Sequence, residues 1–265
     1  MRGCNALLVA VAMLQTASAQ GTEEVKAILD AQTAALVARD HARLVATFSP
    51  DAIVLAPSSP AATPIADVDG DALALVYGSS TLATAKSSKL VVGAAWFAAE
   101  LAFTYKGEKR APKTIRVTAL VDAAGKVVTA MYGRIESPMS SLRIAPLPKS
   151  TPAGPLTKFL TSPADAAAAL SDDAHEVVEG TDKGEYAVGP AAAKKLLGSW
   201  GKLKLSLDAS LSYEVRTKDW GYALGYVNLP SRDPNIKSPV RMSALVIAVP
   251  AGEAWKVVAV HYARM

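Results

Sequence analysis

The spacing of apolar residues predicts an amphipathic helix over residues 23–39. Glu23 and Glu24 favour the positively polarised N-terminal end of such a helix. Gln32 falls on the apolar face and interrupts it. The apolar residues that recur at helical spacing are Val25, Ile28, Leu29, Ala35 and Leu36.

Two shorter segments, 40–54 and 162–178, each read as a capped short helix, a polar turn and a strand. Asp40 is a good N-cap for the first helix. Ser162 and Asp165 form a capping box for the second, with proline at its first helical position. The two halves of the chain therefore begin in a similar way.

Further helices are expected over 69–77 in the first half and 190–197 in the second, with Gly198 as a natural stop. The second half has only a short counterpart of the long first helix, over 156–160. Strands are expected where polar and apolar residues alternate, over 202–207 and 220–226. On the second of these, one face carries Trp220, Tyr222, Leu224 and Tyr226.

The two halves end in similar sequences. RVTALV (116–121) resembles RMSALV (241–246), and KVVTAMYGRI (126–135) resembles KVVAVHYARM (256–265). Agreement over two consecutive strands favours a duplicated unit. The matched pairs are Arg116 with Arg241, Lys126 with Lys256, Tyr132 with Tyr262, and Arg134 with Arg264.

We therefore predict one domain over 22–135 and a second over 156–265. The segment between them, 136–155, is rich in proline and serine and reads as a semi-extended linker. The fold class is α+β.

The N-terminal segment, 1–19, predicts an export signal. Arg2 precedes an apolar run that is too short to span a bilayer, and Ala17 with Ala19 matches a signal-peptidase site. Cys4 lies before the apolar run, unlike a lipoprotein cysteine. We expect cleavage after Ala19, no membrane anchor, and a periplasmic or extracellular location.

Composition narrows the function classes. The net charge of +4 is spread along the chain, without the basic stripe that nucleic-acid binding favours. Removal of the signal also removes the single cysteine, and the three histidines are not at metal-ligand spacing, so no metal site is expected. Phosphate loops, dinucleotide fingerprints and nucleophile elbows are missing from the sequence, so no cofactor is expected.

With LVATFSPDAIVLAP in the first half, and DDAHEVVEGTDKGEYAVG and WKVVAVHYA in the second, the chain resembles the SnoaL-like branch of the nuclear transport factor two-like superfamily. The resemblance covers nearly all of 22–135 and 156–265. It implies two tandem cone-shaped domains, each a curved, mostly antiparallel sheet packed with helices around a pocket. The family includes isomerases, dehydratases, hydrolases and non-catalytic members, and often dimerises through the sheet. Two copies could form an internal pseudo-dimer, or the chain could form a homodimer.

His261 is the first candidate ligand-binding residue. On a regular strand it shares a face with Trp255, Val257 and Ala259, and it could serve as a general base or a polar anchor. A structural histidine at a sheet surface is the alternative. Relatives often carry a second histidine where Ala259 stands, and the first half has Met131 in place of His261, which weakens the case for catalysis.

Asp173 and His175 lie two residues apart at a strand start, so they point to one side, and the acid could fix the imidazole tautomer. An acid after a short helix also serves turns. At the aligned positions the first half has Asp51 and Ile53.

Two further acids are candidates for a pocket. Glu185 lies between two glycine turns and could point into the cone or sit on a hairpin. Glu100 alternates with Trp96, Ala98 and Ala102, and would be an acid in an apolar setting if that face lines the cone.

Three functions remain open. The first is an exported, non-catalytic protein that binds a small, apolar or partly polar molecule. The second is a cofactor-independent acid/base enzyme of the isomerase or dehydratase type, which needs Glu100, or Asp173, His175 and His261, to converge in one cone. The third is an interaction or scaffold protein that uses exposed sheet faces.

Overall fold

A computed structural model describes residues 4–56, 63–68, 70–73, 81–109, 112–135, 154–172, 177–180, 184–230 and 239–264. The fold is α+β, as the sequence predicts. It contains two six-stranded sheets, one from each half of the chain.

The first half begins with the 35-residue helix α1, which covers the expected helix except for Arg39 and continues toward the N-terminus. The elements of this half are α1 (Cys4–Ala38), α2 (His41–Val45), β1 (Phe48–Leu55), β2 (Thr63–Pro64), the 3-10 helix η1 (Ile65–Asp67), α3 (Gly70–Leu73), β3 (Leu82–Val92), β4 (Trp96–Tyr105), β5 (Lys113–Val121) and β6 (Val127–Arg134).

The second half has three short helices at its start and centre, followed by four long strands. Its elements are α4 (Thr157–Thr161), α5 (Pro163–Ala168), β7 (Val177–Glu179), β8 (Tyr186–Val188), α6 (Pro190–Trp200), β9 (Ser206–Arg216), β10 (Gly221–Leu229), β11 (Val240–Ala251) and β12 (Ala254–Arg264). The predicted linker, 136–155, lies almost wholly outside the described residues.

The two sheets have the same topology. Their strand orders are β2-β1-β6-β5-β4-β3 and β8-β7-β12-β11-β10-β9, so each strand of the second sheet is numbered six above its counterpart. In each sheet one pair is parallel, β1 with β6 and β7 with β12, and the other pairs are antiparallel. Each sheet also has a register shift at the corresponding place, which leaves Val128 and Val258 as extra residues.

The sequence alignment of the penultimate strands is wrong by two residues. Val117 pairs with Tyr132, whereas Ala244 pairs with Tyr262. If the two tyrosines are equivalent, Arg116 corresponds to Ser243 and not to Arg241. The alignment based on similar sequence is wrong here because the β11–β12 hairpin is longer than the β5–β6 hairpin. A shift of two preserves which side chains share a face.

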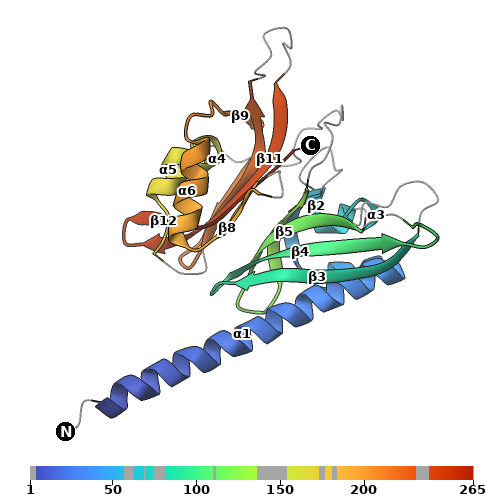
Figure 1. Cartoon of the computed structure of the whole chain (residues 1–265), viewed down its shortest axis with the longest axis horizontal. Helices are drawn as coiled ribbons and strands as arrows, with labels where there is room; N and C mark the ends of the chain where they lie inside the picture. Colours follow the sequence, from blue (N-terminus) through green and yellow to red (C-terminus); the bar gives the residue numbers. More distant parts are fainter. Residues whose placement is uncertain are drawn as a thin grey trace.

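The sheets pack face to face, with the helices on the outside (Figure 1). Alternate residues of β4, including Phe97 and Phe103, contact the α1 side, whereas Trp96 and Ala98 contact the second sheet. The alternation predicted for 220–226 is confirmed, because Trp220, Tyr222, Leu224 and Tyr226 all belong to the cluster between the sheets. The order of layers is helix, sheet, sheet, helix.

Both predicted helix caps are confirmed. The Asp40 side chain accepts a hydrogen bond from the Arg43 main-chain N–H, and Ser162 accepts one from Asp165. Pro163 stands at the start of α5.

Two expectations for the second half are wrong. Gly198 does not end α6, which continues to Trp200 because that residue makes tertiary contacts that outweigh the roughly 1 kcal/mol cost of a helical glycine. The strand expected over 202–207 begins only at Ser206, and Leu203 and Leu205 line a cavity instead. Of the helix expected over 69–77, the structure describes α3; residues 74–80 lie outside the described part.

Candidate functional site

A cavity of about 140 Å³ lies between the helices and the sheet of the second half. Three elements contribute large side chains: Trp200 from the end of α6, Met242 from β11 and Tyr262 from β12. Glu185, just before β8, brings the one carboxylate among the lining residues. The remaining lining residues are Pro163, Gly180, Ser199, Leu203, Leu205 and Leu229.

Trp200 organises the polar side of the cavity. Its indole Nε1–H donates to Glu185 Oε1 (3.2 Å), and its ring meets the Tyr262 ring edge-on, with 5.6 Å between the centroids. Tyr262 is buried, and its hydroxyl lies within hydrogen-bond distance of the Phe159 and Leu160 carbonyl oxygens of α4 (3.2 and 3.1 Å). Burial raises the pKa of this phenol, so Tyr262 is a neutral donor at ordinary pH.

Local sequence explains how these groups come together. Gly189 adopts φ 86°, a conformation that favours glycine, and Pro190 follows as the first residue of α6. Gly180 allows close approach, because a Cβ there would lie 2.5 Å from Glu185 Oε2 and 2.6 Å from the Trp200 ring. Only a glycine at this position lets the turn before β8 pack against α6.

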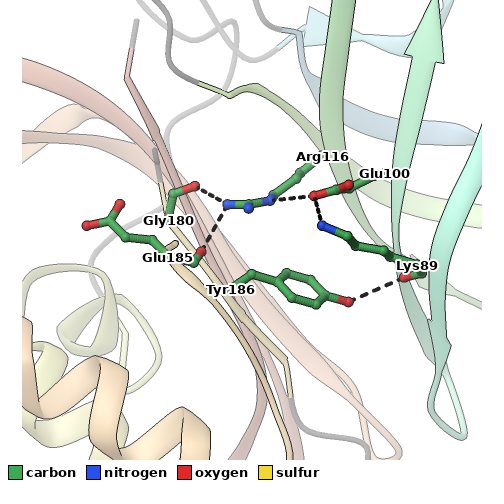
Figure 2. Close-up of polar contacts among 6 residues, drawn as sticks. All are labelled: Lys89, Glu100, Arg116, Gly180, Glu185 and Tyr186. Atoms are coloured by element: carbon green, nitrogen blue, oxygen red, sulfur yellow. Dashed lines mark hydrogen bonds and ion pairs between the residues drawn. The ribbon is translucent and has the colours of Figure 1, made fainter. Parts of the chain in front are cut away.

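A second polar cluster lies between the two sheets (Figure 2). Arg116 of β5 is buried, and its Nη1 donates to the carbonyl oxygens of Gly180 and Glu185, at 2.9 Å each. Its Nε lies 3.4 Å from Glu100 Oε1, which also accepts from Lys89 Nζ at 2.9 Å. Figure 2 shows that the Glu185 side chain points away from Arg116. The main-chain carbonyl of Glu185 therefore belongs to the cluster between the sheets, while its carboxylate lines the cavity.

The structure places His261 in the contact between the sheets and not in the cone. Its Nε2 lies 2.6 Å from the Cβ position that a side chain at Gly133 would occupy. Burial, with the nearby Arg116 charge as a second cause, lowers the pKa of His261 to about 3, so the imidazole is neutral.

The prediction that His261 shares a face with Val257 is wrong. The extra residue Val258 reverses the alternation, so Val257 belongs to the cluster on the helix side, whereas Ala259 and Ala263 belong to the cluster between the sheets. Glu100 likewise faces the second sheet, on the side of Trp96 and Ala98, and therefore does not line its own cone.

Asp173 and His175 lie outside the described residues, and their part in a ligand site stays a prediction. The alignment of His175 with Ile53 is wrong, because Ile53 and Val177 pair with equivalent residues of β6 and β12. Of the three candidate residues that the structure describes, Glu185 lies at the cavity. The structure does not bring Glu185, Glu100 and His261 into one cone.

Two surface grooves accompany the cavity. A groove of about 390 Å³ lies between α4, α5 and the β11–β12 turn, and includes Phe159 and Trp255. Another, of about 290 Å³, lies where α1 meets α2, and includes Arg39 and His41.

The part of the chain that the structure describes contains neither a candidate metal site nor a candidate membrane span. No group of three or more potential ligand residues could hold a metal ion there. Nor is any helix in the same part long and apolar enough to cross a bilayer.

The sequence did not reveal the roles of Trp200, Tyr262 and Arg116. Tyr262 and Arg116 were noted as repeated residues, but repetition alone does not show which face they occupy. Trp200 follows Gly198, which reads as the end of a helix, so the sequence does not indicate that α6 extends to Trp200.

No family model matches the chain, and no curated protein matches it either. Among solved structures, it is similar to a nuclear transport factor two-like protein of unknown function from Burkholderia xenovorans LB400 (17% identity, 46% of this chain and 90% of that chain, TM-score 0.34). It is also similar to RV0760c from Mycobacterium tuberculosis in complex with estradiol-17beta-hemisuccinate (12% identity, 41% and 92%, TM-score 0.33).

A third similar structure is a putative calcium/calmodulin dependent protein kinase II association domain from Xanthomonas campestris (14% identity, 45% and 98%, TM-score 0.34). The structural neighbours are thus nuclear transport factor two-like and cystatin-like folds. At these identities the likeness concerns architecture alone.

Proposed function

We propose that this chain is an exported, non-catalytic protein that binds a compact small molecule in the cavity of its second half. The observation that carries the proposal is the cavity of about 140 Å³ in which Trp200, Tyr262 and Met242 surround one carboxylate, Glu185. Ligand sites are concave and mainly apolar, with a few placed polar groups, and this cavity has that composition.

The volume limits the ligand. Pockets for drug-sized molecules span roughly 300–1,000 Å³, whereas an apolar cavity of about 150 Å³ holds benzene. A cavity of about 140 Å³ therefore suits a molecule the size of one aromatic ring with a short substituent.

The lining limits the chemistry. Aromatic rings and the Met242 thioether favour a flat or apolar group, through ring stacking and sulfur–aromatic contact. The Glu185 carboxylate favours a hydrogen-bond donor or a cation on the ligand. The expected class is a small aromatic or apolar amine, or a related donor.

The placement of the other described ionisable groups supports the non-catalytic assignment. The acid/base alternative needs Glu100, or Asp173, His175 and His261, to converge in one cone. Glu100 and His261 are buried between the sheets and are engaged in that contact. Within the described residues this leaves Glu185 as the acid at the cavity.

We further propose that the two halves, 22–135 and 156–265, are duplicated SnoaL-like domains packed as an internal pseudo-dimer. Identical strand order and the corresponding bulges at Val128 and Val258 support this. Gly133 meets Ala263, its own counterpart, as expected near a pseudo-twofold axis.

Cleavage of 1–19 would leave the mature protein starting at Gln20. N-terminal sequencing of protein from the periplasm or medium tests this; an intact Met1 would contradict it.

Binding can be tested by NMR with three probes of similar size: benzylamine, toluene and benzoate. Benzylamine should shift the Trp200 indole N–H saturably, toluene should do so more weakly, and benzoate should not. The Trp220 indole serves as an internal control, because its ring stacks on Tyr222 between the sheets. An unshifted Trp200 with both benzylamine and toluene would overturn the proposed function.

The variant Glu185→Gln sharpens the test. Its amide oxygen can still accept from the Trp200 indole, but the negative charge is gone. Benzylamine affinity should fall about tenfold, and toluene affinity should stay within about twofold. Equal effects on the two probes would show that the carboxylate does not select the ligand.

A further inference from the structure

We infer that Arg116, a residue of the first half, is a positioning residue for the cavity of the second half. This inference rests on the proposed function for its effect on binding. That the first half holds the turn carrying Glu185 in place does not depend on the proposed function.

Arg116 reaches across the contact between the sheets to a single turn. One nitrogen, Nη1, donates to two main-chain carbonyls of that turn, Gly180 and Glu185. Arg116 is only 1% exposed, so these bonds form away from water. A buried carbonyl that loses a donor is costly, so the guanidinium stabilises this turn, most directly at the Gly180 carbonyl.

The same turn forms the polar wall of the cavity. The Gly180 N–H donates to the Glu185 carbonyl oxygen at 2.7 Å, which closes the turn. On its other side the Glu185 carboxylate accepts from Trp200, and Gly180 packs against the Trp200 ring. Arg116 and Trp200 thus hold opposite sides of one short segment.

Neighbouring residues of both halves surround the guanidinium. Glu100 lies between Arg116 and Lys89 and interacts with both. The Tyr186 ring lies near both cations, at 5.4 Å from Arg116 Cζ and 5.3 Å from Lys89 Nζ, and its hydroxyl donates to the Lys89 carbonyl oxygen. Figure 2 shows these groups arranged from sheet to sheet.

The two sheets differ at the positions of Arg116 and Glu100. In the pairing of the second sheet, Ser243 stands where Arg116 stands in the first, and Tyr226 stands where Glu100 stands. Neither side chain carries a charge or reaches as far as an arginine. At these two positions of the described sheets, the second half therefore lacks the charged pair that the first half has.

Coupling of this kind has two consequences. Loss of Arg116 should loosen the turn and weaken ligand binding, and by linkage a bound ligand should stabilise the contact between the halves. The free protein should show the first effect without any ligand.

The experiment compares Arg116→Met with Leu120→Ala. Leu120 is buried in the same contact between the sheets, but belongs to the apolar cluster, so its loss weakens the contact without removing a donor to the turn. In the ligand-free protein, exchange of the Trp200 indole N–H with solvent should accelerate about tenfold in Arg116→Met and less than about twofold in Leu120→Ala. Benzylamine affinity should fall about five- to tenfold in the first variant only.

Two outcomes would overturn the inference: unchanged Trp200 exchange in Arg116→Met, or equal acceleration in both variants. If the wild-type protein binds neither benzylamine nor toluene, the proposed function fails, while the exchange measurement still decides the inference. Should Arg116→Met not fold, Arg116→Lys and Glu100→Gln replace it. Each should accelerate Trp200 exchange about threefold, and no acceleration in either would equally overturn the inference.

Discussion

Tyr132 and Tyr262 lie at corresponding points of two sheets with the same topology, yet their surroundings differ. In the first half, the Tyr132 hydroxyl donates to the buried Gln32 side chain (3.2 Å), which also donates to Thr47. In the second half, the Tyr262 hydroxyl lies against α4 main-chain carbonyls, and its ring meets Trp200 at the cavity. The long helix α1 thus supplies a buried partner for Tyr132, whereas Tyr262 adjoins the cavity of the second half.

In the contact between the sheets, the charged groups come from the first half and not from the second. The first sheet supplies Glu100 and Arg116, whereas the second supplies Tyr226 and Ser243 at the corresponding pairing positions. The first sheet therefore carries the charged groups of this contact, and Arg116 among them bonds the second half. This difference agrees with the proposal that the first unit supports the second, which holds the cavity.

The largest expected effect comes from Gly133→Val, which tests whether the sheets need close contact. A Cβ at Gly133 would lie 2.6 Å from Ala263 Cβ and 2.6 Å from His261 Nε2. The free energy of unfolding should fall by roughly 3 kcal/mol. Urea denaturation measures this, with Gly184→Val as a control, because a side chain at Gly184 meets no atom within 4 Å. Similar losses in both variants would contradict face-to-face packing.

The second-largest expected effect is a loss of folding stability at acidic pH. His261 has a folded pKa of about 3, below the usual 6.5, so its unfolded form binds the proton first. Stability from this residue is complete above pH 6.5 and is lost as pH falls through that value toward 3. At pH 5 the loss amounts to roughly 2 kcal/mol.

His261→Met, which copies Met131 of the first half, should remove this acid-dependent loss. Urea denaturation at pH 7.5 and pH 5 should show a decrease in wild-type stability that is about 2 kcal/mol larger than in the variant. Equal decreases would mean that His261 is accessible to protons in the folded protein.

A smaller effect separates the two tyrosines. Tyr132→Phe and Tyr262→Phe each remove a buried hydroxyl and should each cost about 1 kcal/mol of unfolding free energy. Only Tyr262→Phe should also change benzylamine affinity, because Tyr262 lines the cavity. An affinity change of the same size in Tyr132→Phe would remove the distinction between the halves.

The smallest effect is a gain. Gly198 lies inside α6, and a Cβ there would meet no neighbouring atom within 4 Å. Gly198→Ala should therefore raise the unfolding free energy by about 0.5–1 kcal/mol through helix propensity. Thermal denaturation should show a small increase in Tm. A decrease would mean that α6 needs flexibility before Trp200.

The sequence predicted the elements that local chemistry determines. The helix caps at Asp40 and Ser162, the apolar face of α1 and the alternation in β10 depend on neighbouring residues, and all are confirmed. The identical strand order is in keeping with the similarity between the ends of the two halves.

Long-range contacts and irregular backbone could not be predicted from sequence patterns. The bulge at Val258 reverses the alternation before His261. The Glu214 carboxylate, on β9, accepts from the Leu156 and Thr157 main-chain N–H groups at the start of α4, more than 50 residues earlier. Arg116 likewise acts on a turn in the other half, which no local pattern indicates.

One titration shows whether the ligand binds in the interior of the second half and not in that of the first. The Trp200 indole reports on the cavity of the second half, and the Gln32 side-chain amide, bonded to Tyr132 and Thr47, reports on the interior of the first. Addition of benzylamine to the ¹⁵N-labelled wild-type protein should shift the Trp200 resonance saturably and leave the Gln32 amide in place. A saturable shift of Gln32, or none at Trp200, would contradict the account.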